Sequence, residues 1–104
     1  MSCLALDHAL DLIRLIAPLC RTLTRHAPKL VDQIRRAATS IANNLAEGQA
    51  RLGRDRRHLA RIAYGSFREV RAAFDVAVAL GLFDAPPAPV LTDRLGAVLY
   101  RLTR

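Results

Sequence analysis

The sequence has no tryptophan, and only five of its 104 residues are aromatic: three phenylalanines and two tyrosines. Hydrophobic residues nevertheless make up 52% of the chain. Any core must therefore be built mainly from the aliphatic side chains of Leu, Ile, Val and Ala. A chain of this length has room for one domain with a working core of its own. We expect a single domain over residues 1–104.

Cysteine is also scarce. Cys3 and Cys20 are the only two, they do not form a Cys-x-x-Cys pair, and neither has a histidine at metal spacing. Such a pattern favours buried or idle thiols, with a disulfide as the alternative. It gives no reason to expect a bound metal.

Long apolar runs are missing too. The most apolar stretch, residues 10–23, is interrupted by Arg14 and Arg21, so no run reaches the ~18 to 20 uncharged residues that cross a bilayer. The N-terminus lacks the basic start and the small-residue cleavage site of a secretory signal. We expect a soluble, cytoplasmic protein that does not contact membranes.

Negative charge is in short supply. Nine Asp and Glu residues stand against sixteen Lys and Arg, of which fifteen are Arg, and the net charge is +7 with a pI near 11.0. This balance favours contact with phosphate or with an acidic partner. The alternative is a solvated surface that happens to be rich in arginine, and charge alone does not separate the two.

What the chain does have is helical periodicity. A first segment covers residues 4–23 and contains Pro18, which should kink or split the helix. Its predicted apolar stripe is Leu6, Leu10, Ile13, Ala17 and Cys20.

A third segment, from Asp55 to Gly81, has the longest stripe. Its predicted apolar set is Leu59, Ile62, Ala63, Phe67, Val70, Ala73, Phe74, Ala77 and Leu80.

Breakers separate the other segments. The second segment begins near Pro28, a residue suited to a first helical turn, and a proline-rich link at residues 86–89 precedes the last one, at residues 91–102. No segment alternates apolar and polar residues with the period of a strand. Four amphipathic helices joined by short loops predict an all-α fold, an antiparallel up-down four-helix bundle.

One side of the third segment carries arginine. Successive helical residues are turned by about 100°, which brings five arginines and a tyrosine within roughly 100° of one another, opposite the apolar side. These residues, here called the arginine face, are Arg54, Arg57, Arg61, Tyr64, Arg68 and Arg71. The face is about 25 Å long, and its ring is available for stacking on a base. It predicts a phosphate-binding surface, with an ordinary solvated helix face as the alternative.

The second segment carries mostly neutral hydrogen-bonding groups on one flank, here called the polar stripe. It consists of Gln33, Arg36, Ser40, Asn43, Asn44 and Glu47, which share an arc of roughly 100°. Neutral polar groups cost less to desolvate than charged ones. The polar stripe therefore suits a hydrogen-bonded contact between subunits or between helices better than open solvent.

Catalytic patterns are absent from the sequence. A di-iron bundle needs Glu-x-x-His pairs, but alanine stands three residues after both Glu47 and Glu69. The three histidines are scattered, and there is no glycine-rich phosphate loop. We expect a protein that is not an enzyme and uses no cofactor. Catalysis by Glu47 beside Arg36 is the remaining enzymatic alternative.

Three stretches resemble a known family: QIRRAATSI at residues 33–41, NLAEG at residues 44–48, and IAYGS at residues 62–66 followed by Glu69. Over about residues 10–81 they closely resemble the bacterial four-helix-bundle family, also called the 23S rRNA intervening-sequence protein family. The resemblance implies a small cytosolic bundle that assembles into a ring-shaped homopentamer. The residues assigned to the family signature or to a subunit contact are Gln33, Arg36, Ser40, Asn44, Glu47 and Gly48.

A more distant resemblance, to the accessory protein of diversity-generating retroelements, implies nucleic acid and a reverse transcriptase as partners. We therefore expect a non-enzymatic homo-oligomer that binds RNA or single-stranded DNA through the arginine face. The alternative is a scaffold that docks a partner protein without binding nucleic acid.

Overall fold

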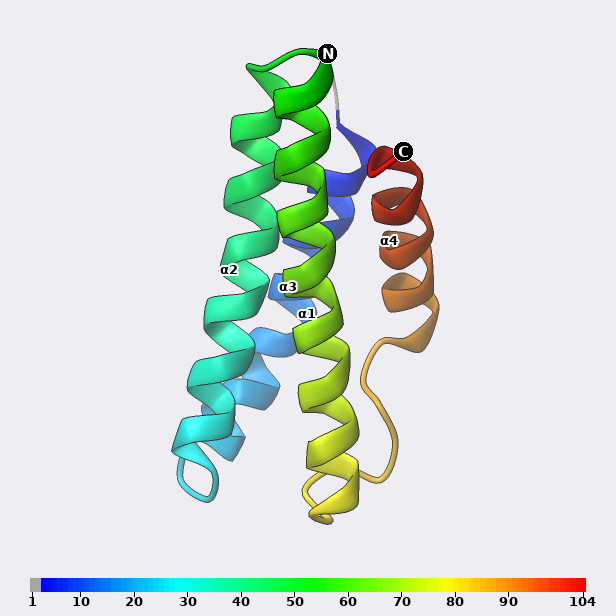
Figure 1. Ribbon diagram of the computed structural model, residues 1–104. Coiled ribbons are helices and arrows are strands. Elements are labelled where there is room, and N and C mark those ends of the chain that lie inside the picture. Colours follow the sequence, from blue (N-terminus) through cyan, green and yellow to red (C-terminus); the bar gives the residue numbers. More distant parts are fainter. Residues whose placement is uncertain (1–2) are drawn as a thin grey trace.

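A computed structural model describes residues 3–104 (Figure 1). Its helices are α1 (Leu4–Leu23), α2 (Pro28–Gln49), α3 (Gly53–Ala79) and α4 (Pro89–Leu102), and the described residues contain no strand. Successive helices run in opposite directions, and each packs against two others: α1 and α3 both contact α2 and α4. The predicted antiparallel four-helix bundle is confirmed.

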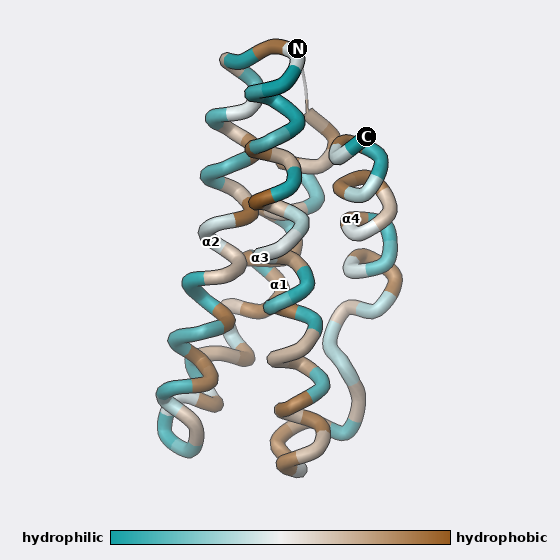
Figure 2. The backbone as a smooth tube through the Cα atoms, in the orientation of Figure 1, coloured by the Kyte–Doolittle hydropathy of each residue, from teal (hydrophilic) through white to brown (hydrophobic). Residues whose placement is uncertain are grey.

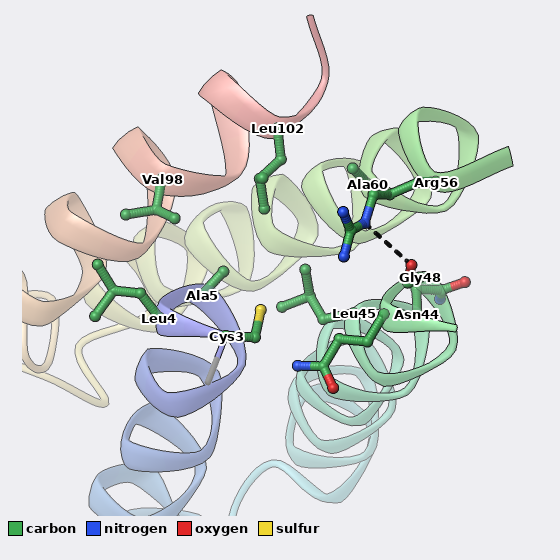
Figure 3. A pocket seen from close by; sticks show the side chains of 11 residues that line it. Cys3, Leu4, Ala5, Asn44, Leu45, Gly48, Arg56, Ala60, Val98 and Leu102 are labelled. Carbon is green, nitrogen blue, oxygen red and sulfur yellow. Dashed lines mark hydrogen bonds between the residues drawn. The ribbon is translucent and has the colours of Figure 1, made fainter. Parts of the chain in front are cut away.

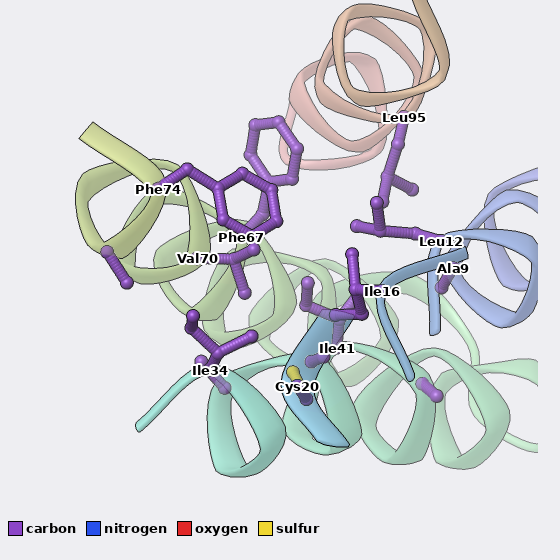
Figure 4. Close-up of a cluster of buried hydrophobic side chains, with 14 of the residues drawn as sticks. Ala9, Leu12, Ile16, Cys20, Ile34, Ile41, Phe67, Val70, Phe74 and Leu95 are labelled. Atoms are coloured by element: carbon purple, nitrogen blue, oxygen red, sulfur yellow. The ribbon is translucent and has the colours of Figure 1, made fainter. Parts of the chain in front are cut away.

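The core is aliphatic, as the composition predicted, apart from two phenylalanines of α3. Phe67 and Phe74 are the largest fully buried side chains, and all four helices contribute to the layer around them (Figure 4). The aliphatic members of this layer are Leu12, Val31, Ile34, Ile41, Val70, Leu95 and Leu99. Figure 2 shows hydrophobic residues recurring among hydrophilic ones along each helix. Burial of one side of every helix therefore holds the bundle together.

The predicted apolar stripe of α1 is wrong in register. The buried residues of α1 are Ala5, Ala9, Leu12, Ile16, Cys20 and Leu23. Of the five predicted, only Cys20 is buried, while Leu10 is 36% exposed and the other three lie half-buried at the edge. Leucines and isoleucines occur on almost every side of this helix, so periodicity permits several stripes. The structure selects the one with two alanines, because small side chains let α1 approach its neighbours closely.

Two members of the apolar set of α3 also lie outside the core. Ile62 is exposed because it lies at the edge of the buried arc, and Leu80 is 65% exposed just beyond the end of the helix. Since α4 has 14 residues and α3 has 27, the fourth helix cannot cover the whole length of the third.

Pro18 does not split α1, which continues to Leu23. Proline leaves the carbonyl of the residue four positions earlier without its helical donor. Here that residue is Arg14, which is exposed, as is Pro18, so water can satisfy the carbonyl. The Thr22 hydroxyl donates to the Pro18 carbonyl over 3.2 Å in the next turn. The prediction of a split helix is wrong because the proline lies on the solvent side.

The two cysteines are free thiols, as predicted. They lie 17 positions apart at the start and in the last turn of one helix, roughly 25 Å from each other, too far for a disulfide within the chain. Cys20 is buried, and this burial raises the pKa of its thiol, while the nearby charge of Arg35 opposes the shift. None of the described helices is long and apolar enough to cross a membrane.

α4 lies close against α3 at Gly96. A Cβ atom at this position would lie 2.7 Å from Cζ and 2.8 Å from Cε2 of Phe67. Phe67 is only 1% exposed, so its ring has little space to move away. Glycine at position 96 thus lets α4 pack directly on the ring.

We expect Gly96→Ala to lower the free energy of unfolding by about 1–3 kcal/mol, because overpacking a filled core forces the ring or the helix to shift. Urea unfolding followed by circular dichroism measures the change. In a Phe67→Leu background the same substitution should cost much less, since the smaller side chain leaves room for the methyl group. An equal cost in both backgrounds would contradict this explanation.

Candidate nucleic-acid interface

The arginine face lies on one continuous helix. α3 runs without interruption from Gly53 to Ala79, through Gly65 in its middle. Asp55 lies in its first turn, where a negative charge is favourable. All five arginines of the face are exposed, and Tyr64 is half-buried. The local spacing that predicted a shared face therefore holds from Arg54 to Arg71.

None of these five guanidinium groups pairs with a carboxylate within residues 3–104. The ion pairs there join Arg14 to Asp11 in α1, Arg36 to Asp32 in α2, and Arg51 of the turn before α3 to Glu47 of α2. The positive charge of the arginine face is thus not neutralised by the described part of its own chain. Guanidinium groups in this state can form bidentate contacts with phosphate.

The arginine face borders α4, and this helix and the residues just after it add two residues that the sequence analysis missed. The ring of Tyr100 lies 5.9 Å from that of Tyr64, at an angle of 56°, and the guanidinium carbon of Arg104 lies 4.8 Å from the centre of the Tyr100 ring. An antiparallel α4 brings its last turns beside the first half of α3, where Tyr64 lies. The four-residue spacing of Tyr100 and Arg104 was a signal that they meet, but not that they meet Tyr64.

The positive surface ends near Arg71. This arginine lies against the Phe67 ring, 5.9 Å from its centre. It also lines a hollow of about 140 Å³ together with Asp75 and Asp93. Two carboxylates at this end lower the local potential, so the strongest positive field lies over the first half of α3.

The middle of the polar stripe is used inside the bundle. The hydroxyl oxygens of Ser40 and Ser66 lie 2.7 Å apart and form a hydrogen bond between α2 and α3. The Asn44 amide donates to the carbonyl and the hydroxyl oxygens of Ser40, over 2.8 and 3.1 Å. For Ser40 the structure therefore supports a contact between helices, while Asn44 donates within α2 to the serine that makes this contact. The stripe residues Gln33, Arg36, Asn43 and Glu47 remain exposed.

Gly48 is buried and faces α3, not the outside of the bundle. A Cβ atom here would meet Cβ of Leu59 at 3.7 Å, an ordinary contact, so packing within the chain does not demand glycine. The Gly48 carbonyl accepts a hydrogen bond of 3.2 Å from Nε of Arg56 (Figure 3). Arg56 is thereby directed toward α2 and lies outside the arginine face.

This hydrogen bond borders a cavity of about 480 Å³ at the end of the bundle where all four helices meet (Figure 3). Its walls are mainly apolar, with Leu4 of α1, Leu45 of α2, and Val98 and Leu102 of α4 among them. Within residues 3–104, no group of three or more His, Cys, Asp and Glu side chains is arranged to hold a metal ion.

Arg104 also changes the acidity of Tyr100. It lowers the pKa of the phenol, first through hydrogen bonding to the hydroxyl and second through its positive charge. The effect provides a direct measure of the contact between the two side chains.

Replacing Arg104 by Gln should raise the pKa of Tyr100 toward that of an ordinary tyrosine. The tyrosinate absorbance, followed against pH in a Tyr64→Phe background, reports on Tyr100 alone because the chain has only two tyrosines. The matched control is Arg101→Gln, in the last turn of α4 and three residues before Arg104. It should leave this pKa nearly unchanged. Equal shifts in the two variants would show that general charge, not the contact, is responsible.

A family model described as 23S rRNA-intervening sequence protein matches residues 3–103. No curated protein and no solved structure gives a match to the chain. The matched range contains all four helices, the polar stripe and the arginine face, which confirms the resemblance found in the sequence. The chain belongs to the 23S rRNA-intervening sequence protein family.

Proposed function

We propose that this protein is a non-enzymatic RNA-binding accessory protein, and that the arginine face contacts the phosphates. The observation that carries the proposal is the row of five exposed arginines on an unbroken helix, without carboxylate partners in residues 3–104. The net charge of +7 supports it, because a basic surface attracts a polyanion from a distance. Family membership adds an association with ribosomal RNA by name only.

Binding of this kind has a characteristic salt dependence. Each arginine that neutralises a phosphate releases condensed counterions, so affinity falls as salt rises, with a logarithmic slope of about 0.7 per phosphate for single strands. Phosphate contacts also carry no sequence information by themselves. The proposed surface should therefore bind different RNA sequences with similar affinity.

We expect the double substitution Arg61→Ala and Arg68→Ala to weaken RNA binding by about tenfold or more at low salt and to reduce the salt slope by about 1–2. Fluorescence anisotropy of a labelled RNA, measured over a salt series, gives both quantities. The matched control is Arg21→Ala with Arg25→Ala, which removes the same charge from the exposed end of α1, a helix that does not contact α3. An equal loss of affinity in both variants would show that only the net charge of the protein matters. Absence of RNA binding at low salt would overturn the proposal.

We further propose that the protein is a homo-oligomer, a pentamer by family resemblance, whose subunits meet on the α2–α3 side. Gly65 supports this location. Nothing lies within 4 Å of the place its Cβ would occupy, although glycine inside a helix costs about 1 kcal/mol relative to alanine. Ile62 and Val76 are exposed on the same side of α3. This side adjoins the exposed part of the polar stripe, and Gly65 lies one helical turn from Arg61 and from Arg68 of the arginine face.

Gly65→Leu should leave the helix content of the protein intact, because the position is open within one chain, but should disrupt its assembly. Native mass spectrometry should give five times the mass of the chain for the unsubstituted protein and a smaller species for the variant. Ala97→Leu on exposed α4 is the control and should keep the larger mass. An unchanged mass for Gly65→Leu would place the subunit contact elsewhere.

A scaffold that docks another protein, such as a reverse transcriptase, is the second candidate function. The exposed leucines of α1, Leu15 at 53% and Leu19 at 37%, favour it because they offer apolar surface to a partner. A stable oligomer that retains no RNA at low salt would support this candidate over the first.

In the leading proposal, five arginine faces on one ring act together, so weak individual contacts give a much higher overall affinity.

A further inference from the structure

The tyrosine pair, Tyr64 of α3 and Tyr100 of α4, forms a fixed aromatic step at the seam between the two helices. Tyr64 stacks on Phe67 with ring centres 6.1 Å apart and an interplanar angle of 23°, and Phe67 is buried in the core. Tyr100 stands beside Tyr64 and is 48% exposed. The inner ring is therefore held by the core, while the outer ring is presented to solvent.

Cations surround this step. Arg61 and Arg68 precede and follow Tyr64 by three and four residues, so they lie one turn away on either side along the same face. Both are exposed. Arg104 lies over the Tyr100 ring, 4.8 Å from its centre. A guanidinium group over an exposed ring is a weak contact, and Arg104 can turn to a phosphate when a base takes its place.

Rings flanked by arginines match what unpaired nucleotides require. Their bases can leave one another and stack on aromatic side chains, while cations follow the backbone. In a duplex the bases are stacked on each other, and protein contacts are mainly with phosphates, sugars and groove edges. A duplex could contact the arginines through its phosphates, but none of its bases would stack on the two tyrosine rings.

We infer that the arginine face binds a single-stranded polynucleotide, with an unpaired base stacked on the tyrosine pair and its flanking phosphates on Arg61, Arg68 and Arg104. This inference rests on the proposed function and narrows its ligand class. It also assigns to the site Tyr100 of α4 and Arg104, which follows that helix. The binding surface is then the α3–α4 seam and not the exposed side of α3 alone.

The chain itself supplies the probe for this inference. It has no tryptophan and two tyrosines, so all of its intrinsic ultraviolet fluorescence above that of phenylalanine comes from the tyrosine pair. A single-stranded RNA and the same strand annealed to its complement are added at low salt, with correction for their absorbance. The single strand should quench the tyrosine emission and bind about tenfold more tightly than the duplex. A labelled copy of each RNA gives the affinities independently by anisotropy.

Two substitutions at the outer ring sharpen the test. Tyr100→Leu should weaken single-strand binding by about tenfold, as expected for the loss of one base–ring stack, and leave duplex binding unchanged. Tyr100→Phe keeps the ring and should retain the affinity. Because position 100 is largely exposed, neither change should unfold the bundle, and circular dichroism checks this.

The outcomes separate the inference from the proposed function. Equal, salt-dependent binding of both RNAs, with unchanged tyrosine emission, would overturn the inference and leave phosphate binding by the arginine face in place. A loss of affinity in Tyr100→Leu that is the same for the single strand and the duplex would also overturn it. Absence of binding by either RNA at low salt would overturn both.

Discussion

The hydrogen bond between Ser40 and Ser66 joins the two longest helices at a place where most of their contact is aliphatic. Aliphatic side chains tolerate small shifts of one helix along another, whereas a half-buried pair of hydroxyl groups is satisfied in one alignment only. Asn44 strengthens this selection because its amide donates to the same serine. The axial alignment of α2 and α3 determines where α1 and α4 can pack, and hence which side of α3 remains free for the arginines.

The architecture was predictable because the signals for it are local. Pro28 at the first turn of α2 and the left-handed Gly81, with φ of 76°, after α3 mark helix ends that follow from backbone sterics alone. The stripe of α1 was not predictable in the same way. Leu10 and Leu12 are equally apolar, and the choice between them depends on how closely Ala5 and Ala9 allow neighbouring helices to approach. Tertiary packing decided the orientation of a helix that is hydrophobic on most sides.

Some residues of the candidate site were likewise predictable from local spacing, and others were not. The five arginines share a helix, so their common face followed from the rotation per residue. Tyr100 in the last turn of α4 and Arg104 just beyond it lie 36 or more positions after Tyr64, and only the packed bundle brings them to it. The contact of Arg56 with the Gly48 carbonyl crosses a turn between helices, and no spacing in the sequence distinguished this arginine from its neighbours. Local periodicity predicts which residues share one face of a helix, whereas contacts between residues of different helices follow only from the packed fold.

Phe67 links the interior of the protein to its surface, since the Cζ–Cε2 edge of its ring lies against Gly96 and the ring stacks with Tyr64. α4 is the shortest helix, it follows the longest connection, and it begins at a left-handed Ala88 between two prolines. Such an element is a natural unit of local opening, with a lower free-energy cost than global unfolding. When α4 detaches, the aromatic step separates although the arginine row on α3 persists. If the proposed function holds, a transient three-helix form would still attract polyanions but would no longer stack unpaired bases, so local opening of α4 would change which nucleic acid is bound.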